Sequence, residues 1–133
     1  MEQGIGYRSF QPYCVAGCYD VMMPDVKYVG GLREMLRCAA EFARHGVAMS
    51  PHNPSGPIAH VASLQVSAAM LSFDMLELQF DESPLFDDLV VSGCPKRTGG
   101  LSALPESNGL GIRLAPEALR ACMERPSLVL EAA

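Results

Sequence analysis

The sequence predicts an α/β fold in which strand, loop and helix alternate, as they do in part of a (β/α) barrel. One apolar run stops at Asp25 and another at His52, and each is followed by Gly/Pro-rich turns and a helical pattern. Asp25, His52 and Glu77 are spaced by 27 and 25 residues, about the length of one strand–helix unit in a parallel array. A complete barrel needs roughly 250 residues, so a chain of 133 residues can hold only part of one.

The elements up to residue 80 follow from hydrophobic periodicity and turn residues. Short apolar runs predict buried strands, whereas apolar residues at three- and four-residue spacing predict helices. Ser9 is a candidate N-cap for the first helix, and His45-Gly46 ends the second. The predicted strands are 19–23, 47–49 and 75–80, and the predicted helices are 9–17, 32–45 and 58–70.

Beyond residue 80 the alternating pattern stops. Residues 81–88 read as an acidic loop and 94–104 as a turn-rich segment. A short strand is predicted at 89–91 and an extended piece at 108–114. A helix over 115–123 starts near a proline, and the last ten residues read as a tail.

Composition excludes several classes of protein. A net charge of −5 without a Lys/Arg cluster argues against a nucleic-acid partner. No apolar stretch approaches the roughly 18 residues that span a membrane, and no secretory signal is visible. The five cysteines form no C-x-x-C pair, which predicts free thiols in a reducing cytoplasm rather than a zinc site.

Three polar residues share one predicted position, the carboxyl end of a strand. If the strands are parallel neighbours about 4.8 Å apart, Asp25, His52 and Glu77 converge over one mouth. An Asp bonded to a His fixes the imidazole tautomer, and such a pair can take a proton from carbon or protonate a leaving hydroxyl. Glu77 could accept a hydrogen bond from a substrate or carry a proton.

Some of the histidines and acids of the chain are explained equally well by a structural role. Asp25, taken alone, is better explained as a cap after Pro24. His52 lies in a proline-rich loop and is a poor candidate for a core histidine. His45 is explained as a charge at a helix C-terminus, and His60 as a helix-surface or packing residue, so neither receives a role.

Four motifs carry a resemblance to a known family. They are Met23-Pro-Asp25 with Gly30-Gly31, Ser50-Pro-His-Asn-Pro-Ser-Gly-Pro57, Leu76-Glu77 and Gly109-Leu-Gly-Ile112. Together they resemble the C-terminal part of the mandelate racemase-like branch of the enolase superfamily, over about residues 2–119. The run from Pro51 to Pro57 is more similar to the acid-sugar dehydratases, galactonate dehydratase among them, than to the racemase.

The resemblance implies Mg²⁺-assisted removal of the proton next to a substrate carboxylate, in a modified (β/α) barrel. Asp25 matches the residue that orients the catalytic histidine, His52 matches that general base or acid, and Glu77 matches a residue near the substrate carboxylate. Glu2 matches the third metal-binding carboxylate. Residues 1–80 would be the C-terminal portion of the barrel, and 81–133 an extension that packs on a capping domain.

The resemblance also implies missing parts: two metal carboxylates, a second base and the capping domain. We therefore expect this chain alone not to bind Mg²⁺ tightly and to be inactive as an isolated dehydratase acting on a small carboxylate or acid sugar. One alternative is a racemase or epimerase of 2-hydroxy acids. Another is a non-catalytic truncated gene product. Open strand edges predict a homo-oligomer or pairing with a complementing barrel segment.

Overall fold

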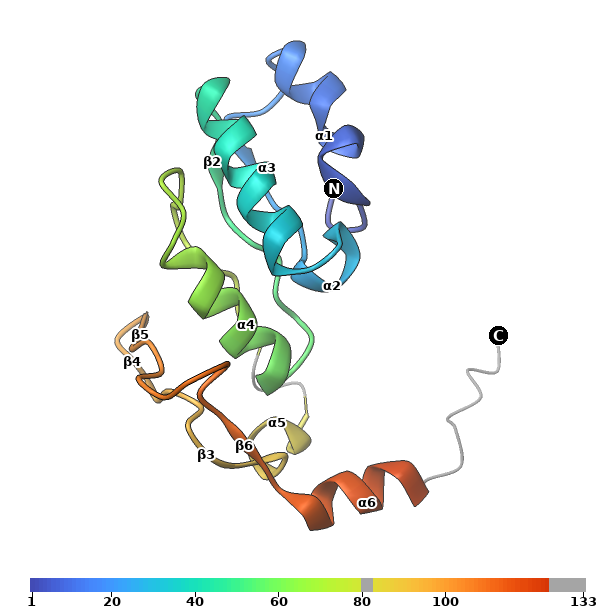
Figure 1. The fold of residues 1–133 in the computed structure, drawn as a ribbon, viewed down its shortest axis with the longest axis vertical. Coiled ribbons are helices and arrows are strands. Elements are labelled where there is room, and N and C mark those ends of the chain that lie inside the picture. The colour runs from blue at the N-terminus through green and yellow to red at the C-terminus, as the bar shows by residue number, and fades with distance from the viewer. Residues whose placement is uncertain (80–82, 125–133) are drawn as a thin grey trace.

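The computed structural model describes residues 1–79 and 83–124, which form a mixed α/β fold (Figure 1). Helices α1 to α3 lie at one end, α4 lies in the middle, and the C-terminal strands lie at the other end. The elements are α1 (Gly6–Val15), β1 (Val21–Met22), α2 (Val26–Val29), α3 (Leu32–Arg44), β2 (Ala48–Met49), α4 (Pro57–Ser67), α5 (Leu85–Asp88), β3 (Val90–Ser92), β4 (Arg97–Thr98), β5 (Leu101–Ser102), β6 (Arg113–Leu114) and α6 (Pro116–Glu124).

Strands β1 and β2 are parallel, with Val21 opposite Ala48 and Met22 opposite Met49. The pairing continues beyond the strands, because the Ser50 N–H donates to the Met22 carbonyl and the His52 N–H to the Pro24 carbonyl. Two successive strand segments therefore end side by side, as the predicted parallel order requires.

The third predicted strand, 75–80, is wrong in its limits. Pairing with β2 begins earlier, at Phe73, and residues 74–79 form no regular strand, while residue 80 lies outside the described part. The Met49 N–H donates to the Ser72 carbonyl, and the next donor on that edge of the segment would be Pro51, which has no N–H. Only the Pro51 carbonyl continues the pairing, by accepting from the Glu77 N–H at 3.2 Å.

The first helix begins at Gly6 rather than Ser9, and Ser9 is not its cap. The Ser9 hydroxyl donates to the Ile5 carbonyl at 2.7 Å, inside the first turn. A free N–H of that turn, on Tyr7, instead donates to the Glu34 carboxylate of α3 at 2.9 Å. The cap comes from 27 residues away, which local sequence patterns do not reveal.

The core lies between α1, α3 and the two parallel strands. Phe10 and Phe42 are fully buried, and their rings meet edge to face at 5.5 Å between centroids. Met22 and Met49 lie side by side in β1 and β2 and belong to the same cluster. The strongly amphipathic α3 was predicted nearly to its last residue because its buried stripe is unambiguous.

The C-terminal part forms two small antiparallel pairs, β3 with β6 and β4 with β5. Residues 81–88 were predicted as a loop, but Leu85–Asp88 form a one-turn helix, α5, that buries Phe86. Of the predicted tail, residues 125–133 lie outside the described residues.

The α/β class is thus confirmed, whereas the described strands form only two-stranded sheets, so the partial barrel remains a prediction. No helix in the described ranges is long and apolar enough to span a membrane.

We expect Phe42→Ala to lower the free energy of unfolding by about 3–5 kcal/mol, because it removes a buried ring and leaves a cavity against Phe10. Urea unfolding measures the change. Leu36→Ala on the partly exposed side of α3 is the matched control and should cost less than about 1 kcal/mol. Equal losses in the two variants would contradict the position of this core.

Candidate active site

Asp25 and His52 meet at the ends of the first two parallel strand segments. They stand opposite each other in parallel register, and the Asp25 Oδ2 lies 3.0 Å from the His52 Nδ1. The Asp25 carboxylate is almost wholly buried, whereas the His52 side chain is 20% exposed. The pair therefore has a protected carboxylate behind an imidazole that reaches solvent.

Both interpretations of Asp25 hold in the structure. Its Oδ1 accepts from the Lys27 N–H at 2.7 Å and caps α2, while its Oδ2 bonds to His52. The Asp25 carbonyl also accepts from the Val29 N–H in the first turn of α2. Hydrogen bonds with the backbone of α2 thus hold Asp25 in place, in addition to its contact with the imidazole.

The bond to Asp25 sets the tautomer of His52. A carboxylate has only acceptors, so Nδ1 carries the hydrogen and the lone pair is left on Nε2. Nε2 faces the Glu77 Oε2 at 3.9 Å, too far for a hydrogen bond but close enough for an ion pair when the ring is charged. His52 can therefore accept a proton at Nε2 and hold it beside a carboxylate.

Glu77 completes this cluster from the third segment. Its Oε2 is buried at the atomic level and has no hydrogen-bond partner among the described residues. A buried carboxylate oxygen without a donor is costly. A shorter contact with a protonated His52 Nε2, which lies 3.9 Å away, would supply that donor.

The structure does not bring Glu2 into this cluster. Glu2 is exposed, and its Oε2 pairs with the N-terminal ammonium at 3.2 Å. Hydrogen bonds from its own backbone N–H and from that ammonium hold the pKa of Glu2 below its ordinary value, with a minor contribution from His52.

The described residues contain no group of three or more acidic, His or Cys side chains that could hold a metal ion. Mg²⁺ prefers near-octahedral oxygen coordination with one or two carboxylates plus water and substrate. Glu2 alone does not offer that set, so these residues do not fit a Mg²⁺ site by themselves.

Directly behind His52 lies a polar pair that sequence patterns did not identify. Asn53 and His60 are each about 1% exposed, and the Asn53 Nδ2 donates to the His60 Nδ1 at 3.1 Å. Burial lowers the pKa of His60 from 6.5 to about 4, with a smaller effect of the Arg97 charge. Of the two predicted places for His60, packing is correct and the helix surface is wrong. Because α4 is apolar on nearly all sides, its sequence does not show which face is buried.

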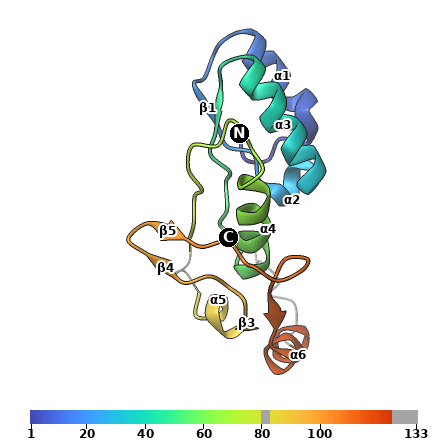
Figure 2. The same ribbon diagram turned by 60° about the vertical axis from the view of Figure 1, so that its left-hand side comes forward.

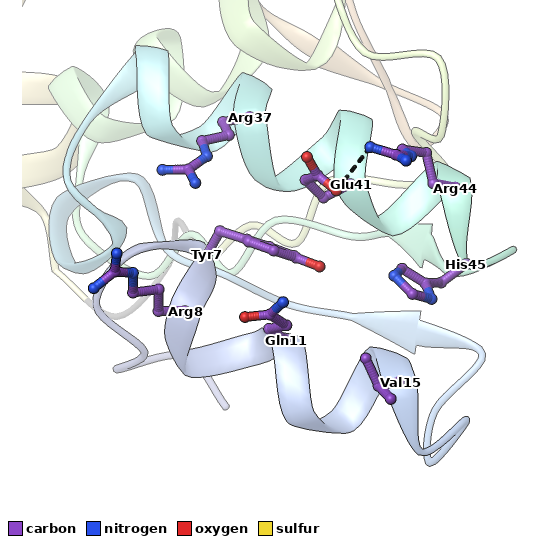
Figure 3. A pocket seen from close by; sticks show the side chains of 8 residues that line it. All are labelled: Tyr7, Arg8, Gln11, Val15, Arg37, Glu41, Arg44 and His45. Carbon is purple, nitrogen blue, oxygen red and sulfur yellow. Dashed lines mark ion pairs between the residues drawn. The ribbon is translucent and has the colours of Figure 1, made fainter.

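A separate polar cavity of about 500 Å³ lies between α1 and α3 (Figure 3). Two of its arginines form ion pairs within the chain: Arg44 lies 3.6 Å from Glu41, and Arg37 lies 3.4 Å from Glu34. None of the unpartnered buried polar atoms of the described residues belongs to it. We assign it no role. Its lining is Tyr7, Arg8, Gln11, Val15, Arg37, Glu41, Arg44 and His45.

This fold and cluster place the chain in a known class. The chain belongs to the enolase C-terminal domain-like family, whose model matches residues 1–118. The resemblance found in its motifs is therefore confirmed.

Its curated relatives include acid-sugar dehydratases. The chain is 33% identical over 99 residues to an L-rhamnonate dehydratase of Saccharopolyspora erythraea, covering 74% of this chain and 25% of the relative. It is 31% identical over 124 residues to a D-galactonate dehydratase of Xanthomonas axonopodis pv. citri, covering 89% and 32%. The chain thus spans a quarter to a third of the length of these relatives.

Solved structures agree with the fold. A mandelate racemase/muconate lactonizing enzyme from Jannaschia sp. CCS1 matches with a TM-score of 0.81 and 27% identity, covering 90% of this chain and 30% of that one. A proposed L-alanine-DL-glutamate epimerase from Burkholderia xenovorans strain LB400, bound to magnesium and fumarate, matches with a TM-score of 0.83 and 26% identity, covering 91% and 30%.

Asp25→Ala should let His52 populate both neutral tautomers, because it removes the acceptor that holds the hydrogen on Nδ1. In the native chain, ¹⁵N spectra of the neutral imidazole should show a protonated Nδ1 and an unprotonated Nε2. In the variant the two signals should move towards each other. Loss of the α2 cap should also cost about 1 kcal/mol of stability.

Asp20→Ala is the matched control, since Asp20 is an exposed acid just before β1 and should leave the His52 tautomer unchanged. A neutral ring with its single hydrogen on Nε2 in the native chain would contradict the assigned bond.

The unfolding free energy should fall by up to about 3 kcal/mol from pH 6.5 to pH 4 through His60. In this window the unfolded chain protonates His60 while the folded chain keeps it neutral, so a lower pH favours unfolding. Urea unfolding at several pH values measures the slope. His60→Phe, which keeps a ring beside Phe86, should flatten it, whereas a His45→Gln control on the surface should not. Equal slopes in the native chain and His60→Phe would show that His60 is not buried neutral.

Proposed function

We propose that this chain supplies the general acid–base part of a Mg²⁺-dependent acid-sugar dehydratase and acts together with barrel strands that it does not itself contain. The observation that carries the proposal is the 3.0 Å bond between Asp25 and His52, which leaves Nε2 free beside the unpartnered Oε2 of Glu77. Residues 1–80 would be the C-terminal portion of the (β/α) barrel. Residues 81–133 would be the extension that packs on a capping domain.

A single imidazole in this position can move the proton that dehydration requires. The neutral His52 accepts the proton from the carbon next to the substrate carboxylate at Nε2. The imidazolium then donates it to the hydroxyl on the adjacent carbon, which leaves as water. Asp25 holds the ring in place and stabilises its charge, and Glu77 accepts a hydrogen bond from a substrate hydroxyl.

Mg²⁺ would supply the stabilisation of the negative charge that develops on the substrate carboxylate. Glu2 would be one of its ligands, and the remaining carboxylates would have to come from outside this chain. The isolated chain is therefore proposed to be inactive, with Asp25, His52 and Glu77 already in position.

A racemase or epimerase is the second candidate, since one of the matching structures is a proposed epimerase. Inversion through two bases needs a second group on the face opposite His52. The nearest lysine in sequence, Lys27, places its Nζ 4.6 Å from the Tyr28 ring centroid on the surface. The curated relatives that match this chain are acid-sugar dehydratases, and we favour dehydration for this reason.

A non-catalytic product that assembles through its open edges is the third candidate. The edge strand β1 and the third segment expose Val21 and Phe73, each about 40% accessible. Such faces pair with another strand or a second copy, so the proposed partners are a homo-oligomer or a complementing barrel segment.

A chimera tests the catalytic proposal. Residues 1–118 of this chain replace the matching segment of the Xanthomonas D-galactonate dehydratase, and turnover of D-galactonate is followed with Mg²⁺ in D₂O by NMR. We expect the chimera to release water from the substrate, and His52→Asn to reduce the rate at least about 100-fold by loss of the acid–base group.

His45→Asn, on an exposed histidine outside the cluster, should keep the rate of the chimera, and the 133-residue chain alone should show neither turnover nor exchange. A folded chimera without activity, or an active His52→Asn chimera, would favour the non-catalytic candidate. Exchange at the substrate carbon without loss of water would favour the epimerase.

A further inference from the structure

The loop that carries His52 has few backbone hydrogen bonds of its own. Pro51 and Pro54 have no N–H to donate. Among the described residues, the His52 N–H is the only backbone donor of residues 51–56 that makes a hydrogen bond, to the Pro24 carbonyl at 3.2 Å. This bond lies on the β1 side, so a hold on the other side of the loop has to come from a side chain.

One side chain of this loop reaches α4. The Asn53 Nδ2 donates to the His60 Nδ1 at 3.1 Å, and both residues are about 1% exposed. His60 lies in the first turn of α4, where its N–H donates to the Gly56 carbonyl. The bond between the two side chains therefore ties the loop to the start of the helix that follows it.

The His60 ring is itself held from the C-terminal part of the chain. Both views place α5 next to the first turn of α4 (Figures 1 and 2). Phe86 of α5 is buried, and its ring centroid lies 6.1 Å from that of His60 at an interplanar angle of 52°. The Arg97 guanidinium lies over the same Phe86 ring, 5.1 Å from the centroid. Packing on this side keeps the imidazole in place, so its Nδ1 is a fixed acceptor for the loop.

The Asn53–His60 pair is costly for stability. The Asn53 Oδ1 and the His60 Nε2 are buried atoms without a hydrogen-bond partner in the part of the chain that the structure describes. A buried polar group without a partner destabilises the folded state, and replacing both members of a buried polar pair by apolar side chains of similar shape can be neutral or stabilising. Stability alone therefore does not explain this pair, whereas a fixed position of the loop does.

The position of Asn53 determines that of His52, because the two are consecutive in a stiff segment. A proline fixes its own φ and restricts the residue before it, so Pro51 and Pro54 limit the backbone on both sides of these two residues. A shift of Asn53 would thus carry the His52 Nδ1 away from the Asp25 Oδ2, which lies 3.0 Å from it. Misplacement of a catalytic group by about 1 Å can cost about 100-fold in rate.

We propose that Asn53 and His60 are positioning residues of the candidate active site. Their hydrogen bond fixes the loop 51–56 from the α4 side and keeps the His52 imidazole in contact with Asp25. Both residues act through His52 and not on the substrate. The consequence for catalysis rests on the proposed function, whereas the effect on the Asp25–His52 contact does not.

Variants of the 133-residue chain test the positioning directly. Asn53→Leu and the double variant Asn53→Leu/His60→Phe remove the hydrogen bond and keep side chains of similar size. In both, the ¹⁵N signals of Nδ1 and Nε2 of the neutral His52 imidazole should move towards each other, because a weaker contact with Asp25 lets both tautomers form. Ser63→Ala, at a fully buried polar residue of the same helix, is the matched control and should leave these signals unchanged. Native His52 signals in both variants would overturn the proposal.

The double variant also separates positioning from a purely structural role. Asn53→Leu alone leaves the His60 Nδ1 unpaired and should be the less stable of the two variants. The double variant leaves neither partner of the bond unpaired, so its free energy of unfolding in urea should equal or exceed that of the native chain. Shifted His52 signals in a double variant of native stability would support the positioning role. A double variant that loses stability but keeps native His52 signals would show that the pair is structural only.

Kinetics of the chimera described above measure the effect on catalysis. The double variant should lower kcat for D-galactonate about 10- to 100-fold with KM nearly unchanged, since the pair does not contact the substrate. Asn53→Leu and His60→Phe alone should each lower kcat about as much as the double variant, because they remove the same bond. Ser63→Ala should keep the kcat of the unsubstituted chimera.

The two proposals fail in different ways. An active chimera whose kcat is unchanged in the double variant would overturn the positioning role, and the proposed function would stand. An inactive unsubstituted chimera would count against the proposed function, and the His52 signals of the 133-residue chain would still decide whether Asn53 and His60 position the ring.

Discussion

The Asp25 carboxylate is the contact on which the arrangement of the candidate site depends. One oxygen accepts from the Lys27 N–H and starts α2, and the other bonds to the His52 imidazole on the neighbouring segment. One buried side chain thus fixes the end of β1, the start of α2 and the orientation of His52. A charged acceptor shared between a helix N-terminus and an imidazole forms stronger hydrogen bonds than a neutral one, which explains how it is held inside the protein.

Neighbouring residues in the second segment point to opposite sides with different consequences. His52 faces the mouth, and its ring keeps a lone pair in reach of solvent, whereas Asn53 is sealed against His60. This follows from the two-residue period of extended backbone. The residue proposed for proton transfer is therefore followed directly by an asparagine that binds a second histidine, which burial keeps neutral.

The sequence predicted what local pattern determines. Periodicity predicted the amphipathic α3 and the parallel order of the first two strand segments. The position of Asp25 and His52 at the ends of these segments predicted that the two side chains meet. Glu77 reached the same place although its strand did not form as predicted, because the Pro51 carbonyl still accepts from its N–H.

What the sequence did not predict depends on contacts between distant segments. At the start of α1 the carboxylate of Glu34, and not Ser9, accepts from a free backbone N–H. Which face of α4 is buried depends on the segments that pack against this helix. The missing N–H of Pro51 was visible in the sequence. Its effect, however, appears only once the strand register shows which edge the N–H would have served.

The Asp25–His52 pair and the metal site differ in how much of the chain each requires. Every bond that the pair itself makes comes from residues 24–52, within one strand–helix–strand unit, through the Pro24 carbonyl, the Lys27 N–H and the Asp25 carboxylate itself. A Mg²⁺ site needs several oxygens around one point, and a fold of parallel strands supplies these from separate strand ends. Among the described residues no group of three or more such side chains gathers, and Glu2, the proposed ligand, is engaged with the N-terminal ammonium. In the proposed function, one strand–helix–strand unit assembles the acid–base pair, whereas charge stabilisation by Mg²⁺ would need further oxygen ligands. For this reason we place the proton-transfer step, but not the whole reaction, within this chain.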